Sequence, residues 1–121
     1  MKKQEILIGA VAGPYSPAVK TEHLLFVSGQ IPLNASGTMP EGIEAQARQS
    51  LENVKAVLKA GGAELENVVK TTIFLVNLGD FDLVNRVYAE YFAKPYPARS
   101  CVEVSKLPKG ALVEIEAVAA I

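Results

Sequence analysis

Arg99 is the residue whose type and neighbours point most directly to chemistry. It belongs to a segment, Ala98–Val104, in which strand alternation puts Arg99, Cys101 and Glu103 on one side. We expect that side to lie on the sheet face opposite the helices, where a guanidinium needs a negative partner. The planar fork of arginine suits a carboxylate bound through two parallel hydrogen bonds. The alternative is an internal ion pair with Glu103, Glu114 or Glu116.

Glu114 is the second candidate, because a carboxylate near an apolar interface can accept a proton from water and return it. It stands in an alternating segment near the C-terminus, and Glu116 points the same way two residues later. Glu116 could therefore fill the same role. The alternative for both residues is a solvent-facing strand position, and the pattern does not separate these interpretations.

Three further residues could contact a ligand. Tyr15 lies in a loop stiffened by Pro14 and Pro17, where its hydroxyl could cover a pocket or its ring could only pack the loop down. Ser28 and Gly29 end a predicted strand, where backbone groups are exposed to a ligand.

Cys101 is a weak candidate for a nucleophile, because the only imidazole in the chain, His23, is far away in sequence. A small buried hydrophobic residue is the favoured interpretation of this cysteine. A chain with one cysteine and one histidine also argues against a zinc or iron–sulfur site. The same composition favours a cytoplasmic location.

Charge and hydropathy argue against nucleic-acid binding and against a membrane span. The formal net charge is −1, which provides no broad basic field for nucleic acid. No apolar run approaches the 18 residues or so of a membrane span. Residues 1–121 contain no linker or repeat, so we expect a single domain.

The elements expected to position these residues follow the order β-β-β-α-β-α-β-β. We expect the first helix over Ile43–Ala60, where apolar residues recur at helical spacing before Gly61 and Gly62. Asp80 is expected to cap the second helix, whose buried stripe is Phe81, Val84, Tyr88 and Tyr91. The strands are expected over Lys3–Ile8, Ala18–Lys20, Leu24–Ser28, Val68–Val76, Ala98–Val104 and Ala111–Ile121.

This order predicts a two-layer α+β domain, with a mixed six-stranded sheet and two helices on one face. Because each helix stands between strands, we expect both to link parallel neighbours. In the last strand one side should pack beneath the helices: Val113, Ile115, Ala117, Ala119 and Ile121. The other side mixes apolar and acidic groups, so we expect the bare sheet face to meet other copies of the chain.

Several segments together resemble the RidA/YjgF family. The segment Pro97–Val104, followed by Leu107–Lys109 and Val113–Ala117, is similar to the C-terminal signature of that family. The similarity extends over nearly the whole chain and includes Gly13–Ser16, Val27–Pro32, Gln46–Val54 and Val69–Thr72.

The resemblance implies a chorismate-mutase-like fold and a homotrimer with three clefts between subunits. It implies deamination of 2-aminoacrylate and related enamine and imine acids, released by PLP-dependent dehydratases, to 2-keto acids and ammonia without a cofactor or metal. Arg99 would grip the substrate carboxylate, and Glu114 would activate water. Tyr15 and Ser28 would lie near the reacting centre, with Gly29, Cys101 and Asn85 orienting the ligand or lining the cleft.

Two other functions remain open at this point. One is a ribonuclease or translation inhibitor, a description also given to members of this family. The other is a non-catalytic trimer that binds carboxylated metabolites or acts as a chaperone. The sequence does not specify the preferred substrate side chain or the partner dehydratase, nor whether Glu114 carries protons or only orients water.

Overall fold

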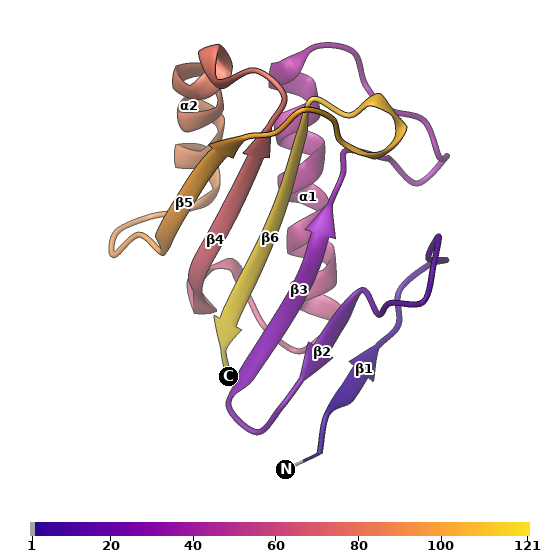
Figure 1. Cartoon of the computed structure of the whole chain (residues 1–121). Coiled ribbons are helices and arrows are strands. Elements are labelled where there is room, and N and C mark those ends of the chain that lie inside the picture. Colours follow the sequence, from indigo (N-terminus) through magenta and orange to yellow (C-terminus); the bar gives the residue numbers. More distant parts are fainter. Residues whose placement is uncertain (1) are drawn as a thin grey trace.

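The computed structural model describes residues 2–121 as one sheet with two helices on one side (Figure 1). The strands are β1 (Gln4–Ile6), β2 (Ala18–Lys20), β3 (Leu24–Gln30), β4 (Val68–Leu75), β5 (Ala98–Glu103) and β6 (Val113–Ala120). The helices are α1 (Ile43–Ala60) and α2 (Phe81–Tyr91), with single 3₁₀ turns at Leu65–Asn67, Leu78–Asp80 and Pro108–Gly110. The expected element order and the two-layer α+β class are confirmed.

The sheet order is β1-β2-β3-β6-β4-β5, which corrects one expectation about the crossovers. The α2 crossover does join parallel neighbours, β4 and β5. The α1 crossover does not, because β6 lies between β3 and β4 and pairs antiparallel with both. The C-terminal strand therefore occupies the centre of the sheet, and β5 forms one edge.

Helix α1 begins and ends where its periodicity predicts. Its stripe of Ala47, Leu51, Val54 and Leu58 is fully buried, and the helix ends at Gly61. Gly62 follows in the left-handed region, with φ of 84°, a conformation that glycine adopts without a steric penalty.

Helix α2 differs from expectation at its start. The Asp80 side chain makes no capping hydrogen bond; instead Asn77 accepts one from the Gly79 amide, within the 3₁₀ turn that precedes the helix. Phe81 stays 36% exposed, Tyr91 is only partly buried, and Val87 is buried in addition to Val84 and Tyr88. The buried stripe is therefore Val84, Val87 and Tyr88, at spacings of three and four residues, and Phe81 lies at its margin.

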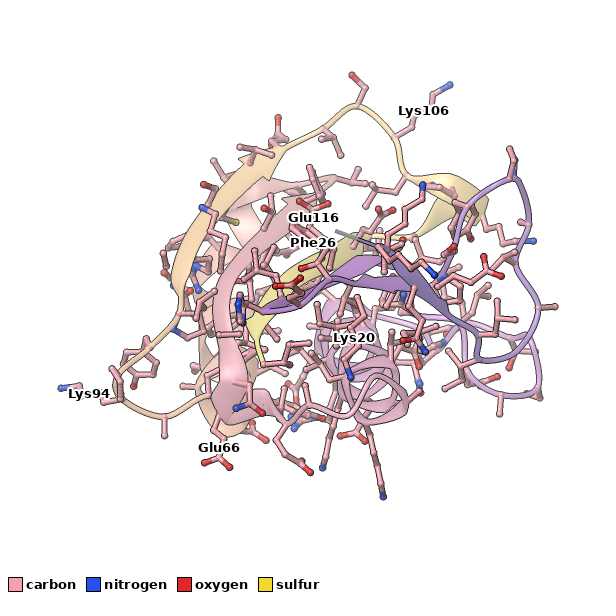
Figure 2. All side chains as sticks on the ribbon, turned by 90° about the horizontal axis from the view of Figure 1, so that it is seen from below. Lys20, Phe26, Glu66, Lys94, Lys106 and Glu116 are labelled. Atoms are coloured by element: carbon pink, nitrogen blue, oxygen red, sulfur yellow. The ribbon has the colours of Figure 1, made fainter. Side chains whose placement is uncertain are left out.

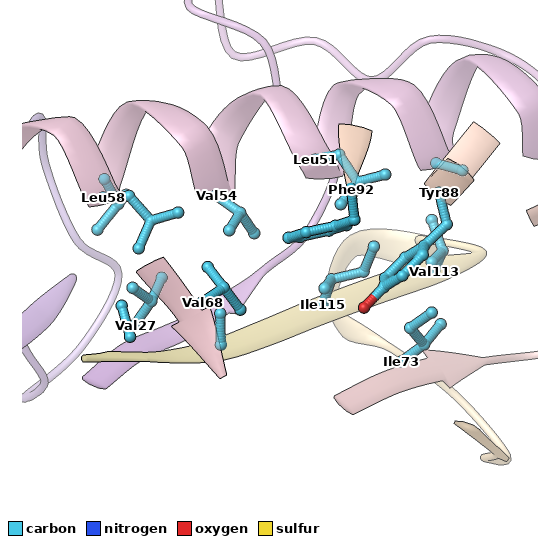
Figure 3. Packing of buried hydrophobic residues seen from close by; sticks show 14 of the residues in the cluster. Val27, Leu51, Val54, Leu58, Val68, Ile73, Tyr88, Phe92, Val113 and Ile115 are labelled. Carbon is cyan, nitrogen blue, oxygen red and sulfur yellow. The ribbon is translucent and has the colours of Figure 1, made fainter. Parts of the chain in front are cut away.

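The core lies between the helices and the inner face of the sheet (Figure 3). Val113, Ile115, Ala117 and Ala119 of β6 point into it, as the alternation predicts. Ile121 was expected on the same side but lies beyond the end of β6 and is exposed. None of the helices in the described part of the chain is long and apolar enough to span a bilayer.

The outer face of the sheet carries both apolar and acidic side chains. Figure 2 shows Phe26 and Glu116 together on the side turned away from α1. Phe26 is exposed, and with Val19, Val118, Thr72 and other residues it borders a hollow of about 210 Å³. This mixed surface is the bare face that the sequence predicts.

Candidate functional site

Arg99 lies on the helix side of the sheet, which corrects the face expected from the sequence. In the parallel pairing of β4 with β5, Arg99 stands beside Thr71 and Cys101 stands beside Ile73. Both β4 residues are fully buried beneath the helices. Side chains at paired positions share a face, so Arg99, Cys101 and Glu103 do lie on one side, but it is the covered side.

The Arg99 guanidinium lies over two aromatic rings of α2. Its Cζ atom is 4.9 Å from the ring centroid of Tyr88 and 5.4 Å from that of Phe81. Within residues 2–121 it forms no ion pair. Glu103, one of the expected alternatives, accepts a hydrogen bond from the Leu78 amide at 2.9 Å instead. The internal ion pair is therefore absent from the described chain, and the guanidinium remains open to an external anion.

Cys101 follows Arg99 by two residues on the same side of β5, and Asn85 lies on α2 between the two residues whose rings Arg99 contacts. Asn85 is half-buried and lies on the same stripe of α2 as Phe81 and Tyr88, since residues three and four apart are neighbours on a helix. Cys101 packs against the core, and burial raises the pKa of its thiol while the charge of Arg99 opposes that shift. A raised pKa disfavours the thiolate, which fits the interpretation of Cys101 as a small buried residue.

Glu114 lies on the outer face, against the backbone of Gly29. A β-bulge in β3 sets Ser28 and Gly29 opposite the single residue Glu116 of β6. A Cβ atom built on Gly29 would lie 2.0 Å from Glu114 Oε2, so only glycine leaves room for the carboxylate in this position. Burial, and next the negative charge of Glu116, raise the pKa of Glu114 above its ordinary value.

Ser28 ties the Tyr15 loop to the bulge of β3. The Ser28 hydroxyl donates a hydrogen bond of 2.6 Å to the Ser16 carbonyl, and the Ser28 amide donates to the Pro17 carbonyl. Tyr15, next along the loop, is exposed, so its ring does not pack the loop onto the core. Ser28 also lines the hollow on the outer face.

One chain thus carries the candidates as two groups on opposite sides of the sheet. Glu114, Gly29 and Ser28 lie together on the outer face, with the Tyr15 loop attached to them. Arg99 lies on the helix side with Asn85 and Cys101, at the β5 edge. The described chain brings the members of each group together but does not bring the two groups together.

Polar residues of α1 that the sequence analysis did not single out support the bulge. Ser50 is fully buried and donates a hydrogen bond of 2.6 Å to the Gln30 carbonyl. Asn53 donates to the carbonyls of Ile31 and Leu33. The sequence held one signal for this support, because Ser50 is a polar residue directly before Leu51 of the predicted buried stripe.

The chemistry of the two groups is that of anion binding and proton transfer. A guanidinium with free N–H donors can hold a carboxylate, and a carboxylate with a raised pKa can exchange protons with water. Among residues 2–121, no group of three or more His, Cys, Asp or Glu side chains is arranged to hold a metal ion.

Comparison with known proteins places the chain in a family. Residues 7–121 match the family described as Endoribonuclease L-PSP. The chain is 55% identical over 113 residues to a RutC family protein, y4sK, of Sinorhizobium fredii, covering 91% of this chain and 88% of that protein. It is 47% identical over 114 residues to the 2-iminobutanoate/2-iminopropanoate deaminase of Escherichia coli strain K12, covering 91% and 89%.

Solved structures agree with this similarity. The crystal structure of E. coli TdcF with bound serine superposes with a TM-score of 0.90 at 42% identity, covering 98% of each chain. The family match spans nearly the whole chain, and the fold agrees with it. The chain therefore belongs to the Endoribonuclease L-PSP family, the family of RidA and YjgF.

Proposed function

We propose that this protein is an enamine/imine deaminase that hydrolyses short 2-imino acids, such as 2-iminobutanoate and 2-iminopropanoate, to 2-keto acids and ammonia. The observation that carries the proposal is the Arg99 guanidinium, which is held on two aromatic rings and pairs with no carboxylate in residues 2–121. The 47% identity to a protein named for this activity supports the choice of substrate.

The reaction needs a held carboxylate, a placed water and a proton carrier, because an imine carbon is already electrophilic. Arg99 binds the substrate carboxylate through two N–H donors. Glu114 accepts a proton from water as the water oxygen bonds to the imine carbon, and it returns this proton to the imine nitrogen. The hydroxyl proton of the resulting carbinolamine is then transferred through Glu114 to the amino nitrogen as the C–N bond breaks, giving the keto acid and ammonia.

The raised pKa of Glu114 suits this role, because a carboxylate that binds a proton more tightly is a stronger base. Tyr15 and Ser28 border the reacting centre, where the Tyr15 hydroxyl donates a hydrogen bond to the substrate. Gly29 and Cys101 orient the ligand through backbone groups, and Asn85 lines the cleft beside Arg99.

We propose that the complete site forms between two copies in a homotrimer. Arg99 and Glu114 lie on opposite sides of one sheet, which supports a site assembled from Arg99 of one subunit and Glu114 of its neighbour. The mixed outer face offers apolar surface for such a contact, and β5 is an edge strand that a neighbour can approach.

The substrates of this reaction are short-lived products of PLP-dependent dehydratases, which we propose as the functional partners. A chain with a single cysteine suits a reducing compartment, which supports a cytoplasmic location.

The proposal is tested by coupling the protein to a serine dehydratase that releases 2-aminoacrylate and by measuring the formation of pyruvate. The wild-type protein should accelerate pyruvate release. Arg99→Ala should lower the acceleration by roughly 30-fold or more, since losing one partner of a desolvated charge pair costs about 2–5 kcal/mol. Arg86→Ala removes an exposed arginine of α2 and serves as the matched control. Equal rates for wild type and Arg99→Ala would reject the proposal.

A mixing experiment tests the shared site. Arg99→Ala and Glu114→Gln subunits are unfolded together, refolded at equal amounts and assayed. Random assembly should restore about a quarter of the wild-type activity, because one in four interfaces then joins an intact Arg99 to an intact Glu114. Failure of the mixture to exceed either parent, with trimers present by light scattering, would show that each site lies within one chain.

A further inference from the structure

Arg99 makes contacts with aromatic side chains that the proposed reaction does not require. A guanidinium needs only its N–H donors to bind a carboxylate, yet here its Cζ atom also lies over two rings from α2. Phe81 opens the helix and Tyr88 follows two turns later, so both rings come from one stripe of α2. We call these two rings the aromatic clamp.

The ring of Tyr88 is fixed more firmly than burial alone requires. Its hydroxyl shares a hydrogen bond of 2.7 Å with the Thr71 hydroxyl, which is fully buried. Its ring lies 4.5 Å from that of Phe92, centroid to centroid. Thr71 is also the residue paired with Arg99 across β4 and β5. Tyr88 is therefore hydrogen-bonded to the β4 residue that stands beside Arg99.

The ring of Phe81 differs, because it is 36% exposed at the start of α2. The Tyr88 ring of the clamp is thus buried and held by a hydrogen bond, while the Phe81 ring borders solvent. A free arginine carries about 2 kcal/mol of rotamer entropy, which binding would have to overcome. A guanidinium already held against two rings loses little of that freedom when a carboxylate arrives.

The electrostatics of a ring favour the same arrangement. The face of an aromatic ring attracts a cation, and guanidinium groups stack on such faces. A ring attracts the cation without supplying a carboxylate, so the guanidinium keeps N–H donors for two parallel hydrogen bonds to a substrate. The clamp thus leaves the positive charge of Arg99 in place, whereas an ion pair with a carboxylate of the same chain would neutralise it.

We propose that Phe81 and Tyr88 are positioning residues, which hold the Arg99 guanidinium over their rings so that its N–H donors are presented to the substrate carboxylate. The inference rests on the proposed deaminase function and deepens it. The clamp acts through Arg99 and takes no part in proton transfer. It also gives a role to the exposed ring of Phe81 at the start of α2.

The test compares Phe81→Leu, Tyr88→Leu and Tyr88→Phe with Val87→Ala. The last variant removes buried apolar volume from the same helix without touching Arg99, so it matches the general loss of packing. The measured quantities are the Kd of 2-oxobutanoate, a stable 2-keto acid, by titration calorimetry, and kcat and KM in the dehydratase-coupled assay.

Phe81→Leu and Tyr88→Leu should each weaken 2-oxobutanoate binding by roughly 2- to 30-fold, the range of a cation–π contact. KM should rise by a similar factor while kcat falls less, because the carboxylate is held equally in the bound and transition states. Tyr88→Phe keeps the ring and should stay within about twofold of wild type. The partly exposed Phe81 keeps the test valid if Tyr88→Leu fails to fold.

A double-mutant cycle separates positioning from structure. Arg99→Lys removes the planar fork, so its cost should be smaller in the Phe81→Leu background than in wild type. If the losses of 2-oxobutanoate affinity caused by Arg99→Lys and Phe81→Leu simply multiply in the double variant, the clamp proposal is overturned. It is also overturned if Phe81→Leu and Tyr88→Leu bind 2-oxobutanoate as tightly as Val87→Ala does. The proposed function fails in a different way: wild-type protein would then show no deaminase activity that depends on Arg99.

Discussion

Replacing Gly29 by alanine would move the Glu114 carboxylate while leaving the rest of the protein in place. The backbone at Gly29 is outside the left-handed region, so alanine is sterically allowed there. Its Cβ would nevertheless lie 2.0 Å from Glu114 Oε2 and 2.8 Å from Cδ. The obstacle is the end of a flexible side chain, which can rotate away.

The expected magnitudes follow from this geometry. Heavy atoms do not approach a Cβ closer than about 3 Å, so the carboxylate oxygen must move by at least about 1 Å. A displacement of about 1 Å can lower a catalysed rate by roughly 100-fold. A side chain forced off its rotamer costs about 0.5–1.5 kcal/mol. The glycine-to-alanine change itself returns about 0.4–1 kcal/mol through the unfolded state, so unfolding stability should change by about 1 kcal/mol or less.

The assay is pyruvate release in the dehydratase-coupled reaction, combined with urea unfolding. Gly13→Ala is the matched control, since its Cβ would make only an ordinary 3.8 Å contact with the Tyr15 ring. Gly29→Ala should lose about 100-fold in kcat/KM relative to this control, at nearly unchanged stability. In a Glu114→Gln background it should have little further effect, because the displaced group is already inactive.

Two results would refute this reasoning. Activity of Gly29→Ala equal to that of Gly13→Ala would mean that the position of the Glu114 carboxylate does not matter. A loss of similar size in the Glu114→Gln background would mean that Gly29→Ala acts through something other than Glu114.

Two further predictions concern pH and the support of the bulge. Burial and Glu116 raise the pKa of Glu114, so ionisation of Glu114 lowers the stability of the folded protein as pH rises through that pKa. Glu114→Gln should therefore unfold at a higher urea concentration than wild type at pH 7. It should show no such gain below about pH 4, near the pKa of an unfolded glutamate. Wild-type activity should fall on the acid side as Glu114 takes up a proton, and a flat rate from pH 4 to 7 would contradict its role as a base. Ser50→Ala should lower the unfolding free energy by about 1–3 kcal/mol, because it leaves the Gln30 carbonyl without its donor, whereas the exposed Ser105→Ala should stay within about 0.5 kcal/mol of wild type in the same urea titration.

Local patterns predicted the helices and strands well, because each pattern has one structural solution. Four apolar residues at helical spacing before Gly61 and Gly62 define α1, since no other conformation buries all four together. The alternation of β6 similarly fixes which of its side chains enter the core.

Strand order was predicted less well, because alternation reports the face of a strand and not its neighbours. A C-terminal strand with one apolar side fits the edge or the centre of the sheet equally well. The insertion of β6 between β3 and β4 depends on pairing over long distances in the chain, which no local pattern encodes.

The prediction of the sheet face on which Arg99 lies was wrong for a related reason. Neither side of β5 is apolar, because Arg99 and Glu103 alternate with Ser100 and the exposed Val102. Alternation therefore grouped Arg99 with Cys101 correctly but could not say which group faces the helices. The register against Thr71 and Ile73 of β4 decides it, and only the folded sheet contains that register.

The corrected face changes how assembly and chemistry are connected in the proposed enzyme. Contact with a second copy would bury Glu114 further and raise its pKa, while an approaching Arg99 would lower it. Substrate carboxylate bound to Arg99 cancels that cation, so Glu114 binds a proton more tightly once substrate is present. A site divided between two subunits can therefore strengthen its base when the anion arrives, which one chain with Arg99 and Glu114 on opposite faces cannot do.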